Sequence, residues 1–367
     1  ATDVQAADAR AGLVEVAARD YAAWTGGLYD RPGVAVRAVD PRAYLARSRD
    51  RFELIVLPPA GALGGTGLMA LAEDHLLTRE QIPRLLQRLD DGGMLAAACW
   101  IDLPLRTCPR LAATLVSGLE AFGVAEPGLH LLGLRAWQLA VLVVSAEPWP
   151  ADAVVRLRAF AEARAFDPVW YPGMPRIEAN RINRMAEPYL HDAIAALAGP
   201  GGDAFIAEYP FDIRPVTDDR PFATSFLKLT SLGQLKQLAA TGAVALIDAG
   251  PVLLLVALLQ SLLIGAVLLL LPLAAFHRAG GQRLGANGVV YFAAIGMGFM
   301  LLEIALLHRL SVLLADPVRS AAVVIAGMLV AAGIGSSLSA KLAARLGPVR
   351  LIRVAVLGIA AAVCALV

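Results

Sequence analysis

The residues best suited to chemistry lie in a short segment bounded by prolines, residues 215–222, which reads PVTDDRPF. Asp218 and Asp219 place two adjacent carboxylates beside the guanidinium of Arg220. Proline fixes φ and removes a hydrogen-bond donor, so the segment is predicted to be a stiff, non-helical turn. Such a turn can hold acidic side chains at the edge of a cleft. It can equally close a domain, because aspartate and proline are common turn residues.

The composition divides the chain at about residue 244. Of 367 residues, 58% are hydrophobic, against about 45–50% apolar in an ordinary globular chain. The excess lies in residues 244–367, which are predicted to form about four transmembrane helices, the last one truncated. The net charge of +1 gives no indication of a nucleic acid partner. Because the chain starts without methionine and ends within an apolar run, we expect it to be part of a longer protein.

The three cysteines, Cys99, Cys108 and Cys364, form no CxxC pair and no cluster with metal-ligand spacing. We therefore expect neither a disulfide framework nor a metal site.

Strand-like and helix-like segments alternate through residues 1–144, which predicts a doubly wound, mostly parallel α/β sheet. The predicted strands are residues 2–6, 34–39, 52–57, 94–99, 130–134 and 138–144. The predicted helices are residues 9–24, residues 41–48, a helix that Thr78 caps and that runs to Leu89, and residues 111–122. Residues 52–57, FELIVL, form a continuous apolar run, which favours a central strand buried on both faces. Thr78 and Gln81 have the spacing of a helix-capping box. The last two strands should form an antiparallel pair.

In open α/β sheets the ligand binds beyond the carboxyl ends of the strands. Here these positions are residues 5–8, Asp40 and residues 57–67.

The chain resembles the membrane-embedded spermidine synthase-like proteins of bacteria, in which an aminopropyltransferase-type Rossmann domain is fused to transmembrane helices. The resemblance rests on the order and spacing of ATDVQAAD, GGLYDRPGVAV, AVDPRAYL, FELIVL, LAEDHLLTREQIPRLLQRLDDGGML and PVTDDRPF, and on the membrane segment YFAAIGMGFMLLEIALLHRLSVLL. It implies a Rossmann-like sheet of the class I methyltransferase type over residues 1–148, lacking its first strand. A C-terminal extension of that domain and a linker would follow over residues 149–243, before the helices of 244–367.

The resemblance also implies an adenosyl cofactor, S-adenosylmethionine or its decarboxylated form. Gln5 stands where the family has an acid for the ribose hydroxyls, with Asp8 nearby. Asp40 matches the acid that holds the adenine amino group. Glutamine is a weaker hydrogen-bond acceptor than a carboxylate, so cofactor binding is expected to be weakened.

The largest departure from the family follows FELIVL, where aminopropyltransferases carry an Asp-rich loop whose acid deprotonates the amine. Here residues 57–61 read LPPAG and supply no base. A positioned base typically contributes about 10²–10⁴-fold, so amine transfer is expected to be impaired. Glu73, next to Asp74 and His75, is the candidate replacement base, although a solvated helix end explains these residues equally well.

Three further candidate site residues lie in the part of the chain before the predicted membrane helices. Tyr171 is either a side chain over the same cleft or a packing residue. His191 and Asp192 are expected on the surface of a helix.

In the membrane half, residues 251–276, 288–307 and 318–338 are long and apolar enough to span, and residues 351–367 begin a fourth span. Glu303 lies inside the second span, where a charge costs at least about 2.5 kcal/mol. With His308 and Arg309 it forms either a proton or substrate relay, or a structural acid paired with a base near the interface.

The side of the membrane that holds the soluble domain stays open. The loops on the far side carry six basic residues: Arg278, Arg283, Lys341, Arg345, Arg350 and Arg353. The domain side carries four: Lys228, Lys236, Arg309 and Arg319. The positive-inside rule thus mildly favours a domain outside the cytoplasm, whereas an adenosyl cofactor is cytoplasmic.

Three functional hypotheses follow for a multi-pass protein of the bacterial inner membrane, whose candidate partners are membrane lipid and further copies of the same chain. The first is aminopropyl transfer from the adenosyl cofactor to a polyamine or other amine, with Glu73, Asp218 and Asp219 on the acceptor side. The second is a catalytically inert domain that regulates or scaffolds a transporter-like helix bundle. The third is an S-adenosylmethionine-dependent methyltransferase.

Overall fold

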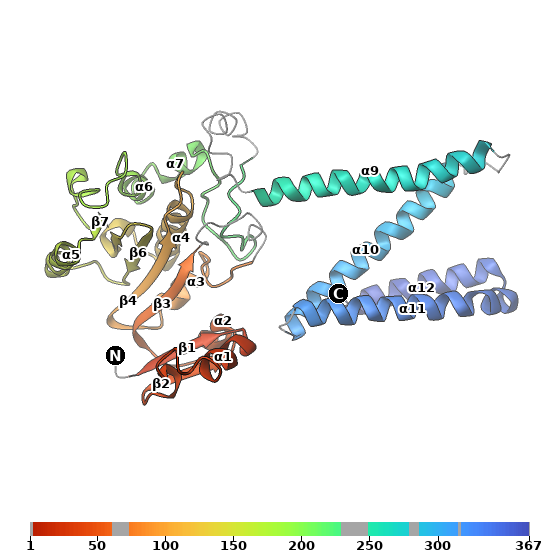
Figure 1. Cartoon of the computed structure of the whole chain (residues 1–367), viewed down its shortest axis with the longest axis horizontal. Coiled ribbons are helices and arrows are strands. Elements are labelled where there is room, and N and C mark those ends of the chain that lie inside the picture. The colour runs from red at the N-terminus through yellow and green to blue at the C-terminus, as the bar shows by residue number, and fades with distance from the viewer. Residues whose placement is uncertain (1–2, 61–72, 229–248, 279–285, 315–316, 367) are drawn as a thin grey trace. The chain divides into compact units, whose positions relative to one another are not determined.

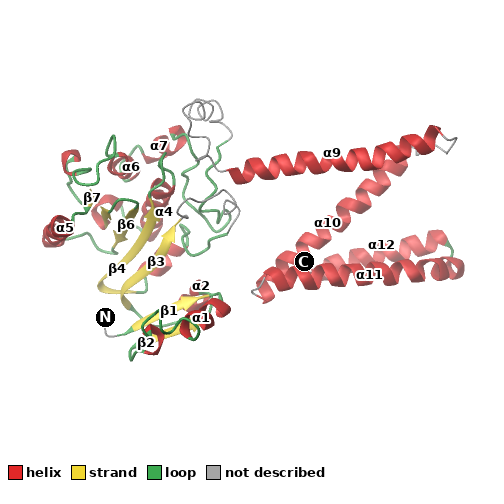
Figure 2. Ribbon diagram, viewed as in Figure 1, coloured by secondary structure: helices red, strands yellow, loops and turns green. Residues whose placement is uncertain are grey.

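The structure is a computed structural model that describes residues 3–60, 73–228, 249–278, 286–314 and 317–366. The chain divides into two compact units, Ala1–Val267 and Leu268–Val367. The strands, coloured yellow in Figure 2, are β1 (Val4–Asp8), β2 (Val34–Ala38), β3 (Phe52–Ala60), β4 (Leu89–Trp100), β5 (Leu131–Arg135), β6 (Leu139–Val144) and β7 (Asp167–Trp170). The helices of the first unit are α1 (Ala11–Ala18), α2 (Pro41–Arg47), α3 (Gln81–Leu86), α4 (Thr107–Phe122), α5 (Ala151–Arg164), α6 (Tyr189–Leu197) and α7 (Gly202–Glu208).

The strands form a two-stranded sheet, β1–β2, and a five-stranded sheet in the order β3-β4-β6-β5-β7. The β1–β2 and β3–β4 pairs are parallel, and every other pair is antiparallel. The expected α/β class is therefore confirmed, and so is the antiparallel β5–β6 hairpin. The expectation of one mostly parallel sheet is wrong, because the larger sheet is mixed and, within the described part of the chain, β1 and β2 pair only with each other.

The five-stranded sheet alternates its side chains between two cores, as the period of two in a strand requires. Leu131 and Leu142 point to the main core, which α3, α4 and α6 complete. Their sequence neighbours Leu132 and Val143 belong to a smaller cluster with side chains of α5 and Tyr171. Helices therefore lie on both faces at the β5–β6 end of the sheet (Figure 1).

The prediction that β3 is the central strand is wrong, because β3 is an edge strand of the five-stranded sheet. Leu57 is buried in the main core, but Leu54 is 50% exposed and Val56 is 67% exposed. A continuous apolar run indicates that both faces of a strand can be covered. It does not determine which strands will be its hydrogen-bond neighbours, and among the described strands β3 bonds to β4 alone.

Several local boundaries also differ from the sequence predictions. The first helix ends at Ala18 and is followed by turns, rather than continuing to Trp24. The predicted turn at residues 90–93 lies inside β4, where the register with β3 shifts between Phe52 and Leu54. The linker region contributes β7, an unpredicted strand beside β5.

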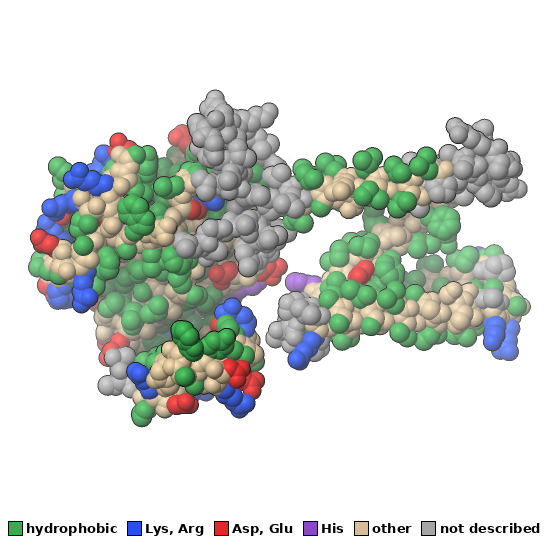
Figure 3. Space-filling view, viewed as in Figure 1, with side chains coloured by type: hydrophobic (Ala, Val, Ile, Leu, Met, Phe, Trp, Pro, Cys, Tyr) green, Lys and Arg blue, Asp and Glu red, His purple; other side chains and the backbone are tan. Residues whose placement is uncertain are grey.

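Four long helices follow: α9 (Ala249–Arg278), α10 (Ala286–Leu314), α11 (Pro317–Leu346) and α12 (Pro348–Leu366). Within the described residues, two stretches are long and apolar enough to cross a membrane, Val290–Leu310 in α10 and Arg319–Ser339 in α11. A shorter apolar stretch, Leu254–Leu268, lies in α9. Hydrophobic side chains stand out along the surfaces of these helices (Figure 3).

Candidate functional site

The PVTDDRPF segment is bound to the rest of the first unit at both of its ends. The N–H of Arg79 donates to the carbonyl of Val216 (2.8 Å), and the N–H of Asp74 donates to the carbonyl of Pro221 (2.7 Å). Arg110, in α4, donates to the carbonyl of Phe222 (2.9 Å) and to that of Ser225 (2.6 Å). The predicted non-helical turn is confirmed, with an isolated bridge between Thr217 and Arg220.

Asp218 is the central side chain of this turn. Its two carboxylate oxygens accept hydrogen bonds from the guanidinium of Arg42 in α2, one of them at 2.8 Å. The hydroxyl of Thr78 donates a third bond (2.7 Å), and the N–H of Asp218 donates to Glu80 (2.9 Å). The Arg42 hydrogen bonds lower the pKa of Asp218 to about 2. So held, Asp218 is a poor base for an amine at neutral pH.

The remaining acids of the predicted acceptor side are not all equivalent. Asp219 is exposed to solvent, and so is Glu73. Glu73 lies 3.4 Å from Nε2 of His75, which is also exposed. Asp74 instead accepts the N–H of Leu76 (2.9 Å) and so stabilises its own loop. Two of the predicted acids therefore stay accessible to a substrate: Glu73, which lies beside His75, and Asp219.

The three candidate cofactor residues all have partners within the β1–β2 part of the fold. Gln5 accepts a hydrogen bond from the hydroxyl of Tyr44. Asp8 pairs with Arg10, whose side-chain hydrogen bond lowers the pKa of Asp8. Asp40 is the N-cap of α2 and accepts the N–H of Ala43 at 2.8 Å. Each of these contacts supports local structure, so a ligand would have to share or displace them.

Arg42 connects the cofactor candidates to the acceptor candidates, and sequence reasoning missed it. It lies two residues after Asp40 on α2, and it bonds both to Asp218 and to the carbonyl of His75 (3.3 Å). The structure thus brings α2, the 75–80 segment and PVTDDRPF together. Nothing local marks Arg42 as the partner of an acid 176 residues later.

The same contacts overturn the predicted capping box. The hydroxyl of Thr78 bonds to Asp218 rather than to the helix, and α3 begins after Glu80 without a side-chain cap.

Tyr171 does not join this group. Its ring is buried with Met174 and Ala179, and its hydroxyl donates to Glu178 (2.5 Å). Burial, with Glu178 as the second cause, raises the pKa of Tyr171 to about 12. Of the two interpretations of Tyr171, packing is therefore the one that fits its contacts.

The expectation of an exposed His191 is wrong, because its side chain is buried. The centroid of its ring lies 5.7 Å from that of the Trp170 ring. The buried face of α6 includes this position, which the sequence pattern did not indicate. Asp192 accepts two bonds from Arg176, each 2.9 Å long, and these lower its pKa.

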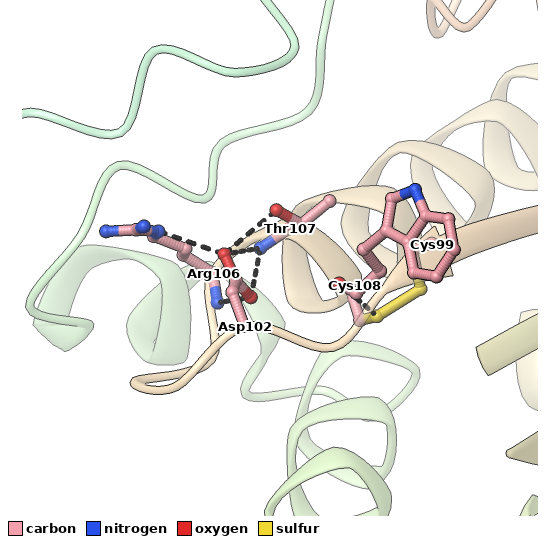
Figure 4. Close-up of a disulfide and its surroundings, with 6 residues drawn as sticks. Cys99, Asp102, Arg106, Thr107 and Cys108 are labelled. Atoms are coloured by element: carbon pink, nitrogen blue, oxygen red, sulfur yellow. Dashed lines mark hydrogen bonds and ion pairs between the residues drawn. A yellow bond between two sulfur atoms is a disulfide. The ribbon is translucent and has the colours of Figure 1, made fainter. Parts of the chain in front are cut away.

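The expectation of no disulfide is also wrong. Cys99 in β4 and Cys108 in α4 are joined, with their Cα atoms 5.4 Å apart (Figure 4). Spacing rules consider only sequence distance, whereas here a strand-to-helix connection folds back and places the two residues side by side.

In the second unit, Glu303 of α10 is half-buried, while His308 and Arg309 are exposed. Both readings of Glu303, relay or structural acid, stay predictions. Among the described residues, no group of three or more metal-ligating side chains comes together. The sequence matches no protein-family model, and it has no significant match among curated proteins.

Proposed function

We propose that this chain is a membrane-anchored, spermidine synthase-like protein whose α/β domain has a structural or regulatory role for its membrane helices, rather than an aminopropyl-transfer role. The observation that carries this proposal is the bond between Arg42 and Asp218. The motif that would supply acids to an amine instead holds α2, the 75–80 segment and α4 together.

The chemistry of the adenosyl side supports the same proposal. Gln5, Asp8 and Asp40 already bond to Tyr44, Arg10 and the start of α2. S-adenosylmethionine or its decarboxylated form would meet a neutral amide at Gln5, which binds a ribose diol less strongly than a carboxylate does. The resemblance to the spermidine synthase-like proteins and the membrane-anchored bacterial location are parts of this proposal.

Membrane anchoring in the proposal extends to all four helices, α9 to α12. The two long apolar stretches in α10 and α11 support it, and the exposed leucines and valines of α9 and α12 agree with contact to lipid. Extraction of cell membranes with alkaline carbonate tests this part. The full-length protein should stay in the membrane pellet; release into the supernatant would refute the anchoring.

Aminopropyl transfer is the second candidate, because the exposed Glu73 with His75 offers a base beside the PVTDDRPF turn. The purified full-length protein should be incubated with decarboxylated S-adenosylmethionine and putrescine, and spermidine measured by mass spectrometry. We expect no product above the level without protein, with a working aminopropyltransferase as positive control. Turnover that is lost in Glu73→Gln, and kept in Asp219→Asn, would establish the transferase instead.

A methyltransferase is the third candidate, and the same preparation tests it. Incubation with S-adenosylmethionine and putrescine should release no S-adenosylhomocysteine under the proposed function.

A further inference from the structure

The cross-link between Cys99 and Cys108 lies in the most protected part of the first unit. Both residues have no exposed surface, and both belong to the main core. Cys99 is near the end of β4, and Cys108 is in the first turn of α4. The disulfide therefore closes the β4-to-α4 connection from inside the core.

The connection itself is built to bring the two sulfur atoms together. Asp102 accepts the backbone N–H of Arg106 (3.1 Å) and of Thr107 (3.2 Å), and it also accepts bonds from both of their side chains (Figure 4). These contacts start α4 one residue before Cys108. The pairing is thus part of a defined turn rather than a chance approach of two surface thiols.

A buried structural disulfide indicates that the domain folds in an oxidising compartment. Such bonds form and persist in oxidising compartments and are rare in the cytosol, where thiols are kept reduced. To form this bond, the two thiols lose two protons and two electrons. The electrons pass to the disulfide of a thiol oxidant by exchange, and the oxidant becomes a dithiol.

The charges of the second unit independently indicate a domain outside the cytoplasm. The end formed by α11 and α12 carries Lys341, Arg345, Arg350 and Arg353, and no acidic residue occurs from 317 to 367. The end formed by α10 and α11 carries two basic residues, Arg309 and Arg319, together with Asp316. The basic α11–α12 end is therefore the cytoplasmic one by the positive-inside rule.

We propose that the α/β domain lies on the extracytoplasmic side of the membrane, where Cys99 and Cys108 are oxidised to their disulfide. The charge argument rests on the proposed four-helix anchoring: if α9, α10 and α11 each cross once, the domain lies opposite the α11–α12 end. The disulfide indicates the same side of the membrane whatever the number of spans. A domain on that side is separated from cytoplasmic adenosyl cofactors, which agrees with a structural rather than a transferase role.

Site-directed labelling tests the side of the domain. Single cysteines are introduced in a Cys364→Ser background, one at Ile177, which is 86% exposed in the domain, and one at Arg345 near the end of α11. Cells with a permeabilised outer membrane are treated with a membrane-impermeant maleimide, and then lysed cells are treated in the same way. We expect Ile177→Cys to react before lysis and Arg345→Cys only after it. Asp152→Cys, on the exposed surface of α5, provides a second domain position if the first variant is poorly produced.

The redox state of the native cysteines is measured in the same cells. After acid trapping and denaturation, the wild-type chain should bind one maleimide through Cys364, and three after reduction. Protection of the domain positions before lysis, or three reactive thiols without reduction, would overturn the proposal. Failure of the membrane anchoring would look different, because the chain would then leave the pellet in carbonate.

Discussion

The guanidinium of Arg42 and the carboxylate of Asp218 form a bidentate, hydrogen-bonded ion pair. The two residues are 176 positions apart in the sequence. Through this pair, α2 is bound to the PVTDDRPF turn, and through Thr78 to the segment before α3. The side chains of Arg42 and Asp218 are 24% and 33% exposed, so water screens the pair only in part. The PVTDDRPF motif, whose residues most suggested chemistry, thus also holds separate elements of the first unit together.

Replacing Asp218 with asparagine should lower the unfolding free energy by about 1–2 kcal/mol, because a charged hydrogen bond is lost and Arg42 keeps its charge. All five tryptophans lie in the first unit, so tryptophan fluorescence of the full-length protein reports its unfolding. Asp219→Asn is the matched control, since its side chain is exposed, and it should unfold like the wild type. Equal losses in both variants would contradict the role given to Asp218.

The same pair predicts a dependence on pH. Asp218 has a pKa of about 2 in the folded protein, below its ordinary value of 3.8, so the folded state binds its proton less readily than the unfolded state. The stabilisation is then fully present above about pH 4 and is lost as the pH falls towards 2. The midpoint of acid unfolding should move to higher pH in Arg42→Gln. An unchanged midpoint would show that the pair does not contribute.

Reduction of the Cys99–Cys108 disulfide should destabilise the first unit by about 2–3 kcal/mol, the entropy expected for closing a short loop. The cysteines are nine residues apart, and both are buried, so the reductant must be added during unfolding and the protein refolded. Urea unfolding is then compared with and without reductant. Cys364→Ser should respond to the reductant as the wild type does, whereas a Cys99→Ala, Cys108→Ala double variant should show no response.

Asp167 and its partner Arg135 form a buried ion pair. Asp167 has no exposed side-chain surface and accepts the N–H groups of Arg181, Ile182 and Asn183, each at 2.7 Å, and it pairs with Arg135 at 3.4 Å. Burial lowers the pKa of Arg135, and Asp167 opposes this shift.

Asp167→Asn should therefore cost about 3–5 kcal/mol, because the buried guanidinium loses its counter-charge. Denaturant unfolding measures the loss. The exposed pair Asp152–Arg156 is the comparison, and Asp152→Asn should change little. A small loss at Asp167 would mean that the Arg135 pocket admits water.

Gly118 of α4 packs directly against Ile82 of α3. A Cβ atom at this position would lie 2.5–2.9 Å from three side-chain atoms of Ile82, which is fully buried. Gly118→Ala should destabilise by about 1–3 kcal/mol through overpacking, although alanine is the better helix former. Gly12→Ala on α1 meets nothing within 4 Å and should be neutral or stabilising. Thermal unfolding of both variants, followed by tryptophan fluorescence, measures the difference.

Local patterns in the sequence predicted local structure well. The predicted strand at residues 138–144 matches β6, and the predicted helix at residues 41–48 matches α2, which begins at Pro41. Both depend on neighbours within a few residues, which the sequence displays directly.

Long-range competition explains what the sequence did not predict. Thr78 has the spacing of a cap, but Asp218, 140 residues later, takes its hydroxyl. Residues 52–57 have the composition of a central strand, but the choice of neighbours left β3 with one partner. The sequence singled out Asp218 but not its partner Arg42, because only the folded chain brings the two side chains together.

The last prediction concerns the adenosyl ligand. Calorimetry with decarboxylated S-adenosylmethionine should show weak or no binding to the full-length protein, because Gln5 offers a neutral acceptor where the resemblance implies a carboxylate. The difference should be on the order of 1 kcal/mol, which is less than tenfold in affinity. Gln5→Glu should therefore raise the affinity by up to about tenfold, since a carboxylate can accept from both Tyr44 and a ribose hydroxyl.

Asp40→Asn is the matched loss-of-charge variant. Asparagine caps a helix about as well as aspartate, so α2 and the melting temperature should be preserved while any residual binding through the carboxylate falls. If wild-type binding is tight and neither variant changes it, Gln5 and Asp40 do not contact the ligand, and the cofactor side of the resemblance is wrong for this chain. If binding appears only in Gln5→Glu, the α/β domain keeps the outline of an adenosyl site from which the charge has been removed.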